Sequence, residues 1–397
     1  MARYRKNASG AGTIRRRSKN CWEGRFTTGF DQQTGKQIQD CVYGKTQKEV
    51  REKLTQISVD LDNGDYIAPT QMTLGEWLEI WQNEYMGDKK WSTRKNYKTQ
   101  IRNHIKPRLG KYRLSDLSPH MVQAFVNAML RGDGKTEPLS AKTVHNVHGV
   151  LRKALAVAVR LEYLRRNPAE STILPRIDKT GIKPLTDEQV AKMIAAAGDD
   201  AYGTILKFIL LIGVRLGEAM GLTWDCVDFE RKRITINKQL QKRPLKDGGC
   251  QLVPVKNDKV RIIAPAPTVM RMLSEWQKRQ KEQRLLAGAV WNGWRNESDR
   301  KEAFVFTNEL GQHLHDTSIR RHFKMLAAEV EAPEARIHDL RHTFAVISLQ
   351  NGDDVKTVQG NLGHASAAFT LDVYGHVSER MKEESASRME AYLAALN

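Results

Sequence analysis

The sequence predicts an α+β protein of several domains: a small N-terminal β-sheet with one helix, an all-α domain of four helices, and a mainly α C-terminal domain with a small β-sheet. Three observations lead to this prediction. The chain has 397 residues, more than one hydrophobic core usually serves. Apolar residues alternate with polar ones near the N-terminus and recur every three or four positions further on. Segments containing proline separate these regions. We expect domains over residues 1–67, 73–170 and 184–397.

The composition favours a polyanionic partner. The formal net charge is +18 at pH 7, an excess typical of proteins that bind nucleic acid. No apolar run reaches the length of about eighteen residues that a membrane span requires. The basic N-terminus is not followed by the apolar segment of a secretory signal, so we expect a cytoplasmic protein. The four cysteines lack CxxC spacing, which argues against a zinc module and a disulfide framework.

The N-terminal domain is expected to hold a small sheet backed by a helix. Residues 21–30 and 37–43 alternate in polarity and predict two strands joined by a turn. Thr46 can cap a helix that runs to about residue 63. Basic residues cluster on and before the first strand, and we expect five of them to bind DNA: Arg15, Arg16, Arg17, Lys19 and Arg25.

Two interpretations of this sheet are open. Its aromatic residues Trp22, Phe26 and Tyr43 could lie in a DNA groove beside the basic residues, as in proteins that read DNA with a β-ribbon. Alternatively, the aromatic residues form the core of the sheet and the charges form a solvated face. The pattern of this segment alone favours the second interpretation.

Helical periodicity dominates the second domain. Helices are expected from Leu74 to Trp81, from Ser92 until Pro107 ends the second helix, and after the N-caps Ser118 and Ser140. Their polar positions carry charges of mainly one sign, which fits a face laid against phosphates better than an ordinary solvated face. The candidate DNA-binding residues here are Lys95, Lys98, Arg102 and Lys142.

A capping box at Thr186 opens the C-terminal domain. A buried run over residues 205–212 breaks at Gly213 and is followed by Arg215. Strands are expected at 233–237 and 251–265, the latter as a hairpin whose turn contains Lys256, and helices at 267–286 and 317–328.

A histidine and an arginine share one face of a helix further along. His338 and Arg341 stand three residues apart, so both side chains could converge on one anion. His342 stands four residues from His338, the spacing of the HExxH zinc motif. However, position 339 is aspartate instead of glutamate, and Arg341 would place a cation beside the metal. We therefore predict no metal site; buried structural histidines are the plainer alternative.

Each remaining candidate has an ordinary structural explanation when it is taken singly. Arg215 could pair with Glu218 at a helix end, and Lys256 could be a hydrated turn lysine. His364 could lie near a helix C-cap, and Tyr374 could be a packing residue.

Together and in this order, the segments resemble the signature of the tyrosine recombinase (phage integrase) family. They are Gly213-Val214-Arg215-Leu216-Gly217-Glu218, Lys256, His338-Asp339-Leu340-Arg341, Leu362-Gly363-His364 and Tyr374. The resemblance implies that the catalytic residues are Arg215, Lys256, His338, Arg341, His364 and the nucleophile Tyr374. Glu218 and Asp339 would orient them, with a plain structural role almost equally expected. The first 67 residues resemble, less closely, the arm-binding domain of integrases from conjugative transposons.

The resemblance implies a site-specific recombinase of a mobile element, in the bacterial nucleoid, that cuts and rejoins DNA through a 3′-phosphotyrosyl bond. It implies no metal, ATP or other cofactor, because the covalent bond stores the energy of the phosphodiester. Expected partners are double-stranded DNA at core and arm sites, further copies of the chain in a tetramer, and accessory proteins that bend DNA or direct excision. The C-terminal helix over residues 377–393 would dock on its own domain or on a neighbouring protomer.

Three other functions share part of this pattern. A type IB topoisomerase would use the same chemistry to relax supercoils, and a regulator would bind DNA without covalent chemistry. A metal-dependent nuclease would lose its activity in chelator.

Overall fold

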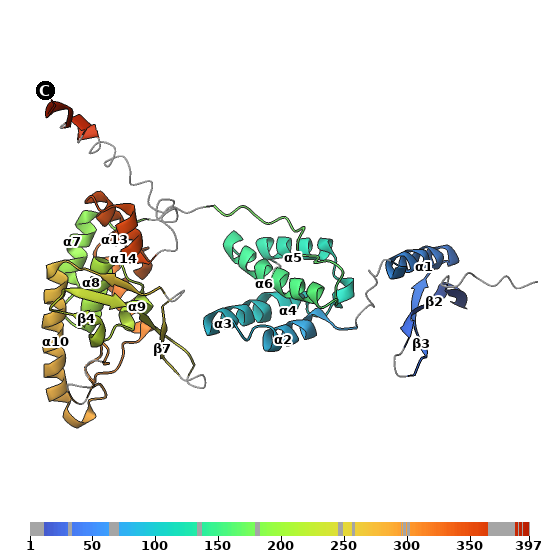
Figure 1. Ribbon diagram of the computed structural model, residues 1–397, viewed down its shortest axis with the longest axis horizontal. Coiled ribbons are helices and arrows are strands. Elements are labelled where there is room, and N and C mark those ends of the chain that lie inside the picture. Colours follow the sequence, from blue (N-terminus) through green and yellow to red (C-terminus); the bar gives the residue numbers. More distant parts are fainter. Residues whose placement is uncertain are drawn as a thin grey trace, which may run out of the picture. The chain divides into compact units, whose positions relative to one another are not determined.

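The computed structural model describes residues 12–30, 34–62, 71–132, 137–178, 183–244, 249–255, 259–294, 296, 299, 302–363, 386–387, 389–390 and 392–396. The chain divides into two compact units, Met1–Lys179 and Thr180–Asn397. The first unit contains a sheet with one helix and a group of helices, and the second contains helices with two small sheets (Figure 1). None of the helices in the described ranges has the length and apolarity that a membrane crossing requires.

Three antiparallel strands and one helix form the N-terminal part. Strands β1 (Thr13–Ser18), β2 (Cys21–Phe30) and β3 (Gln37–Gly44) pair in the order β1-β2-β3, and helix α1 (Gln47–Asp62) packs on one face (Figure 1). The expected strands and helix are therefore present. Strand β1 was not predicted, because its basic residues hide the alternation that marks a strand.

The packing of α1 decides between the two interpretations of the sheet. Phe26 is buried with Val50 and Leu54 of α1, and Trp22 packs against this core. The interpretation that places these two aromatic rings in a DNA groove is therefore wrong. Tyr43 is exposed on the opposite face of the sheet, which we call the open face.

The helical part of the first unit has a separate core. It consists of α2 (Leu74–Glu84), α3 (Trp91–Gln100), the π-helix η1 (Ile101–Ile105), α4 (Lys106–Leu109), the 3₁₀ turn η2 (Leu114–Asp116), α5 (Pro119–Arg131) and α6 (Ala141–Arg160). Trp77 of α2 is fully buried, and its Nε1 donates to the carbonyl of Ala154 at 3.0 Å. Ser118 and Ser140 cap α5 and α6 as predicted.

The prediction that Pro107 ends the second helix is wrong. The chain passes through the π-helix η1 and continues as α4 to Leu109. The π turn shifts the hydrogen-bond register so that Pro107 falls in the first turn of α4, where its missing N–H is not needed.

The second unit is built mainly from helices. They are α7 (Asp187–Ala196), α8 (Ala201–Ile212), α9 (Leu216–Met220), α10 (Pro267–Ala287), α12 (Asp316–Glu329), α13 (Ile337–Gln350) and α14 (Val355–Leu362), with 3₁₀ turns η3 (Trp224–Cys226) and η6 (Gly288–Val290). Helix α8 is the apolar run predicted from the sequence, and it lies in the main core. Thr186 caps α7 with the expected capping box. The helices expected at 267–286 and 317–328 are confirmed.

Two small antiparallel sheets accompany these helices. One has the order β4 (Val227–Asp228), β5 (Arg233–Ile236), β8 (Arg261–Ile263), and the other pairs β6 (Lys238–Gln241) with β7 (Gln251–Pro254). The expected hairpin over 251–265 is wrong, since β7 and β8 pair with different strands. Pairing β8 with β5 aligns Ile263 with Ile234, and both side chains enter the core.

Candidate active site

Arg215 is positioned by the end of helix α8. The helix stops at Gly213, which has a left-handed φ of +73°. A Cβ there would clash with the ring of Phe344 and lie 2.9 Å from Leu362, so glycine is required by both conformation and space. Two residues later Arg215 is the N-cap of α9, and its backbone N–H donates to Glu218 at 3.0 Å.

Arg341 extends from α13 into the interior of the second unit. Its side chain is only 1% exposed. Nη1 donates to the carbonyl of Gly213 at 2.7 Å, and Nη2 donates to the carbonyl of Leu362 at 2.6 Å. Arg341 therefore connects the ends of α8 and α14.

The last residues of α14 bring Arg215 and Arg341 together. Arg215 Nη2 donates to the carbonyl of Gly363 at 3.4 Å, one residue after the carbonyl that accepts from Arg341. Gly363 has φ +63° and forms the C-cap of α14, as the structural alternative for this segment expected. Two guanidinium groups from distant segments thus hold consecutive main-chain carbonyls.

Of the other four candidate catalytic residues, only His338 lies within the described part of the chain. His338 lies on α13 three residues before Arg341. Lys256, His364 and Tyr374 lie outside the described residues. The predicted C-terminal helix over 377–393 is described at only a few positions, which are helical at 386–387, 389–390 and 392–394.

Both histidines of α13 are held neutral. Desolvation lowers the pKa of His338 below its usual value, and the positive charges of Arg341 and Arg215 lower it further. Desolvation also lowers the pKa of His342, to about 4, and the neighbouring His338 adds to this effect. Their rings are perpendicular, with centroids 4.8 Å apart. Within the described ranges, no three His, Cys, Asp or Glu side chains come together as metal ligands would.

A buried ionic network supports Arg215, and one of its members was missed in the sequence. Glu218 is 1% exposed and accepts from Arg215 Nη1 at 2.8 Å and from Arg261 Nη2 at 2.5 Å. Arg261 Nε also donates to the carbonyl of Asn361 at 2.8 Å. Burial raises the pKa of Glu218, but the hydrogen bonds from Arg261 and the charges of both arginines outweigh it and hold this pKa at about 2. Arg261 thus connects β8 to α9 and α14.

The sequence contained a signal for Arg261. Successive residues of a strand point to opposite faces, so Arg261 shares the inner face with the buried Ile263, while Ile262 is exposed. An arginine on the inner face of a strand needs a buried acidic partner.

Asp339 has a local structural role. It accepts hydrogen bonds from the backbone N–H and the guanidinium of Arg336, which caps the start of α13. Burial raises its pKa, but the hydrogen bonds from Arg336 outweigh this and keep it below the usual value.

The nine candidate DNA-binding residues lie in the first unit. Arg15, Arg17 and Arg25 contact the carboxylate of Glu23 on the open face. Arg16 faces the other way and donates to the carbonyls of Ser18 and Lys19. The candidates of the helical part are exposed: Lys95, Lys98, Arg102 and Lys142.

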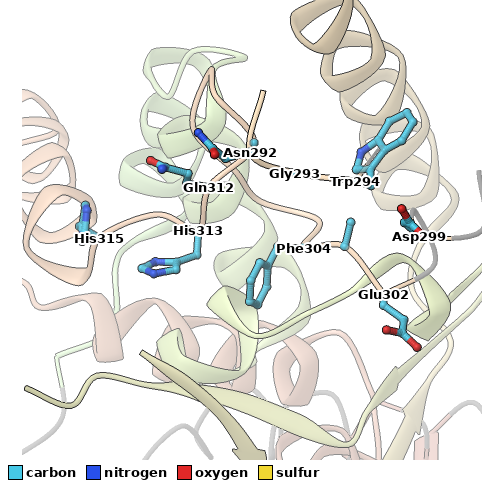
Figure 2. Close-up of a pocket in the computed structure, with 11 residues that line it drawn as sticks. Asn292, Gly293, Trp294, Asp299, Glu302, Phe304, Gln312, His313 and His315 are labelled. Carbon is cyan, nitrogen blue, oxygen red and sulfur yellow. The ribbon is translucent and has the colours of Figure 1, made fainter. Parts of the chain in front are cut away.

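A separate cavity of about 710 Å³ opens in the second unit between residues 292 and 315. Figure 2 shows His313, Phe304 and Trp294 among its lining residues. The described candidates Arg215, His338 and Arg341 are not among the residues that line it.

Comparisons with known proteins agree on one family. The profile of the phage integrase family matches residues 183–381, and that of the phage integrase N-terminal SAM-like domain matches residues 73–130. A tyrosine recombinase XerC-like protein of Caldanaerobacter subterraneus is 27% identical, with 90% of this chain and 92% of the relative covered. The ICEBs1 integrase of Bacillus subtilis is 24% identical, with 92% and 95% covered.

A solved structure has the same fold. The structure of the Tn1549 transposon integrase in complex with a circular intermediate DNA matches with a TM-score of 0.65 at 21% identity, covering 80% of this chain and all of that one.

Proposed function

Because the chain belongs to the phage integrase family, it is a mobile-element tyrosine recombinase that breaks and rejoins DNA, and we propose that Arg215, His338 and Arg341 bind the scissile phosphate. The observation that carries this proposal is the pair of guanidinium groups on the carbonyls of Leu362 and Gly363. Attack on a phosphodiester places charge on its nonbridging oxygens, and a guanidinium can bind two such oxygens at once.

Access of a phosphate to Arg341 depends on movement of the chain. Arg341 gives its Nη1 and Nη2 to one main-chain carbonyl each. Since Arg341 is 1% exposed, a phosphate can reach it only if neighbouring segments move. His338 is neutral near pH 7, so it can accept a proton or donate a hydrogen bond without adding charge.

Three further residues complete the proposed mechanism. Tyr374 attacks the phosphorus to form a 3′-phosphotyrosyl bond, and Lys256 protonates the departing 5′-oxygen. His364 follows directly on Gly363, whose carbonyl accepts from Arg215, and this position in the chain supports a role for His364 in the phosphate pocket. A phenol with a reference pKa of about 10 needs roughly 4 kcal/mol to ionise at pH 7, and a cationic pocket lowers that cost.

DNA capture is proposed for three domains over residues 1–67, 73–170 and 184–397. Their separate hydrophobic cores support this division. The basic residues of the sheet would hold arm sites, and those of α3, η1 and α6 would hold core sites. The logarithm of the DNA association constant should fall linearly with the logarithm of the salt concentration, with a slope near −0.9 for each neutralised phosphate. An association constant that does not change with salt would contradict this part of the proposal.

We also propose that several copies of the chain assemble on DNA through the C-terminal helix. Its described residues expose Met389, Tyr392 and Leu393, which could pack on a neighbouring protomer. Sedimentation of the chain with its DNA, before and after removal of residues 377–397, tests this assembly.

A covalent trapping assay tests the reaction itself. The full chain is incubated in chelator with a nicked duplex that carries the ends of its mobile element, and the protein–DNA adduct is measured. We expect adduct with the natural chain, none with Tyr374→Phe, and a rate lower by a factor of about 10² to 10³ with Arg341→Lys, because one preorganised donor pair is lost. Formation of the adduct by Tyr374→Phe would contradict the assignment of Tyr374 as the nucleophile. DNA cleavage that strictly requires a metal ion would favour a nuclease.

A further inference from the structure

The open face of the N-terminal sheet contains a carboxylate that is covered by arginine side chains. Glu23 is the third residue of β2, the central strand of the sheet, and is 1% exposed. Arg15 lies directly opposite it on β1, and Arg25 is two residues further along β2 on the same face. Arg17, two residues after Arg15, lies at an irregularity of the β1–β2 register and contacts the same carboxylate.

The three arginines use different atoms to reach Glu23. Arg15 binds it through both Nε and Nη2, at 3.1 and 2.9 Å. Arg25 donates a hydrogen bond through Nε at 2.7 Å, and the Nε of Arg17 forms an ion pair with the same carboxylate at 3.1 Å. An anchor at Nε leaves Nη1 and Nη2, the pair at the tip of the guanidinium, for a partner outside the protein. Both side chains are about half exposed.

The charges of Glu23 and the three arginines leave this face suited to bind an anionic or polar partner. The hydrogen bond from Arg25 lowers the pKa of Glu23 to about 2 against the effect of desolvation, and Arg15 lowers it further. Glu23 therefore remains ionised wherever the protein is folded near neutral pH. One carboxylate against three guanidinium groups leaves the open face positively charged.

The carboxylate decides what these arginines are suited for. Contacts to phosphates depend on charge, and a carboxylate beside the arginines weakens them. Contacts to base edges depend on the direction of the donors, and a fixed Nε anchor defines the plane and direction of the guanidinium. The tip of an arginine matches O6 and N7 of guanine, which face the major groove. Glu23 therefore weakens the attraction of these arginines for phosphates, but it fixes the direction in which their guanidinium groups can donate to a base.

We propose that Glu23 is a positioning residue that holds Arg17 and Arg25 for bidentate recognition of guanine in the major groove of the arm site. The inference rests on the proposed arm-site function of the N-terminal domain. The competing explanation is that the four charges only stabilise the sheet, and the experiment below separates the two.

The test is selection of bound DNA from a randomised duplex library by the full chain, with excess nonspecific DNA as competitor. Positions enriched by the natural chain but not by a variant with Arg15, Arg17 and Arg25 all changed to Ala define the arm segment. Enriched positions that remain in this variant belong to the core segment and report that the rest of the chain is intact.

We expect guanines in the arm segment. Glu23→Gln should reduce the preference for them by roughly tenfold or more, the size of one or two bidentate base contacts, and leave the core segment unchanged. Arg25→Lys keeps a cation beside Glu23 but removes the forked tip, so it should relax one guanine position. Lys48→Gln is the matched control, because it removes one exposed charge from α1, on the other side of the sheet, and should leave the guanine preference intact.

Each result decides a different point. An arm segment without guanines, or a guanine preference that survives both Glu23→Gln and Arg25→Lys, overturns the role of Glu23 but keeps the arm-site function. If no enriched segment depends on the three arginines, the arm-site function fails and the inference fails with it. Should Glu23→Gln unfold the sheet, as circular dichroism would reveal, Arg25→Lys alone decides.

Discussion

Glu218→Gln is the most informative single change in the second unit. Folding lowers the pKa of Glu218 from 4.5 to about 2. At about 1.4 kcal/mol for each pH unit, this difference corresponds to about 3 kcal/mol of stability. Glutamine keeps the shape of the side chain but loses its charge, which leaves Arg215 and Arg261 facing each other without a carboxylate. We expect the variant to lose about this amount near pH 7.

The pH dependence gives the same prediction a second check. Because the pKa is lower in the folded state, the contribution of Glu218 is fully present above about pH 4.5. It should disappear as the pH falls toward about 2, so the natural chain and the variant should converge in stability at low pH.

Native-state hydrogen exchange of the α8 amides measures this stability for the second unit alone. The matched control is Glu188→Gln, which breaks an exposed pair with Lys192 on α7 and should leave the exchange of the α8 amides nearly unchanged. Equal exchange of the Glu218→Gln and Glu188→Gln variants at pH 7 would refute the reasoning. In the trapping assay, Glu218→Gln should also slow adduct formation, since Arg215 loses its anchor.

Three further changes test other parts of the site. Arg261→Lys should slow cleavage by roughly tenfold or more while leaving DNA affinity unchanged, because a hydrogen bond to a charged group is worth about 1.5–3 kcal/mol; an equal loss of binding and cleavage in gel-shift and trapping assays would count against a positioning role. His342→Gln should make the free energy of unfolding less dependent on pH between pH 6.5 and about 4, because the natural imidazole is neutral in the folded state and gains a proton on unfolding. An unchanged pH dependence would contradict this role of His342. Gly213→Ala should cost at least about 1–2 kcal/mol from its left-handed backbone alone, as thermal unfolding can measure, whereas the control Gly360→Ala, in α14 with open space around its Cβ, should be tolerated.

The sequence predicts local features of this protein well. Caps at Thr186, Ser118 and Ser140 were found because a capping hydrogen bond involves residues only three apart. The α8 run and its end at Gly213 were predicted for the same reason: apolar residues and a glycine occupy adjacent positions.

Features that depend on distant partners were not predicted. Which strands pair with β7 and β8 is set by packing of Ile263 with Ile234, and no local pattern contains this information. The role of Arg261 requires Glu218 and Asn361, which are far away in the chain. The π turn before Pro107 is a change of register that residue preferences do not encode.

Because Arg341 binds the carbonyls of Gly213 and Leu362, the proposed site can cleave DNA only after the second unit has folded. The proposed phosphate pocket exists only after α8, α13 and α14 have packed, because α13 carries Arg341 and the ends of α8 and α14 supply the carbonyls that fix both arginines. During synthesis, the basic sheet and the helical part leave the ribosome before any of these helices. If the first unit binds DNA as proposed, a nascent chain can hold DNA before it can cut it.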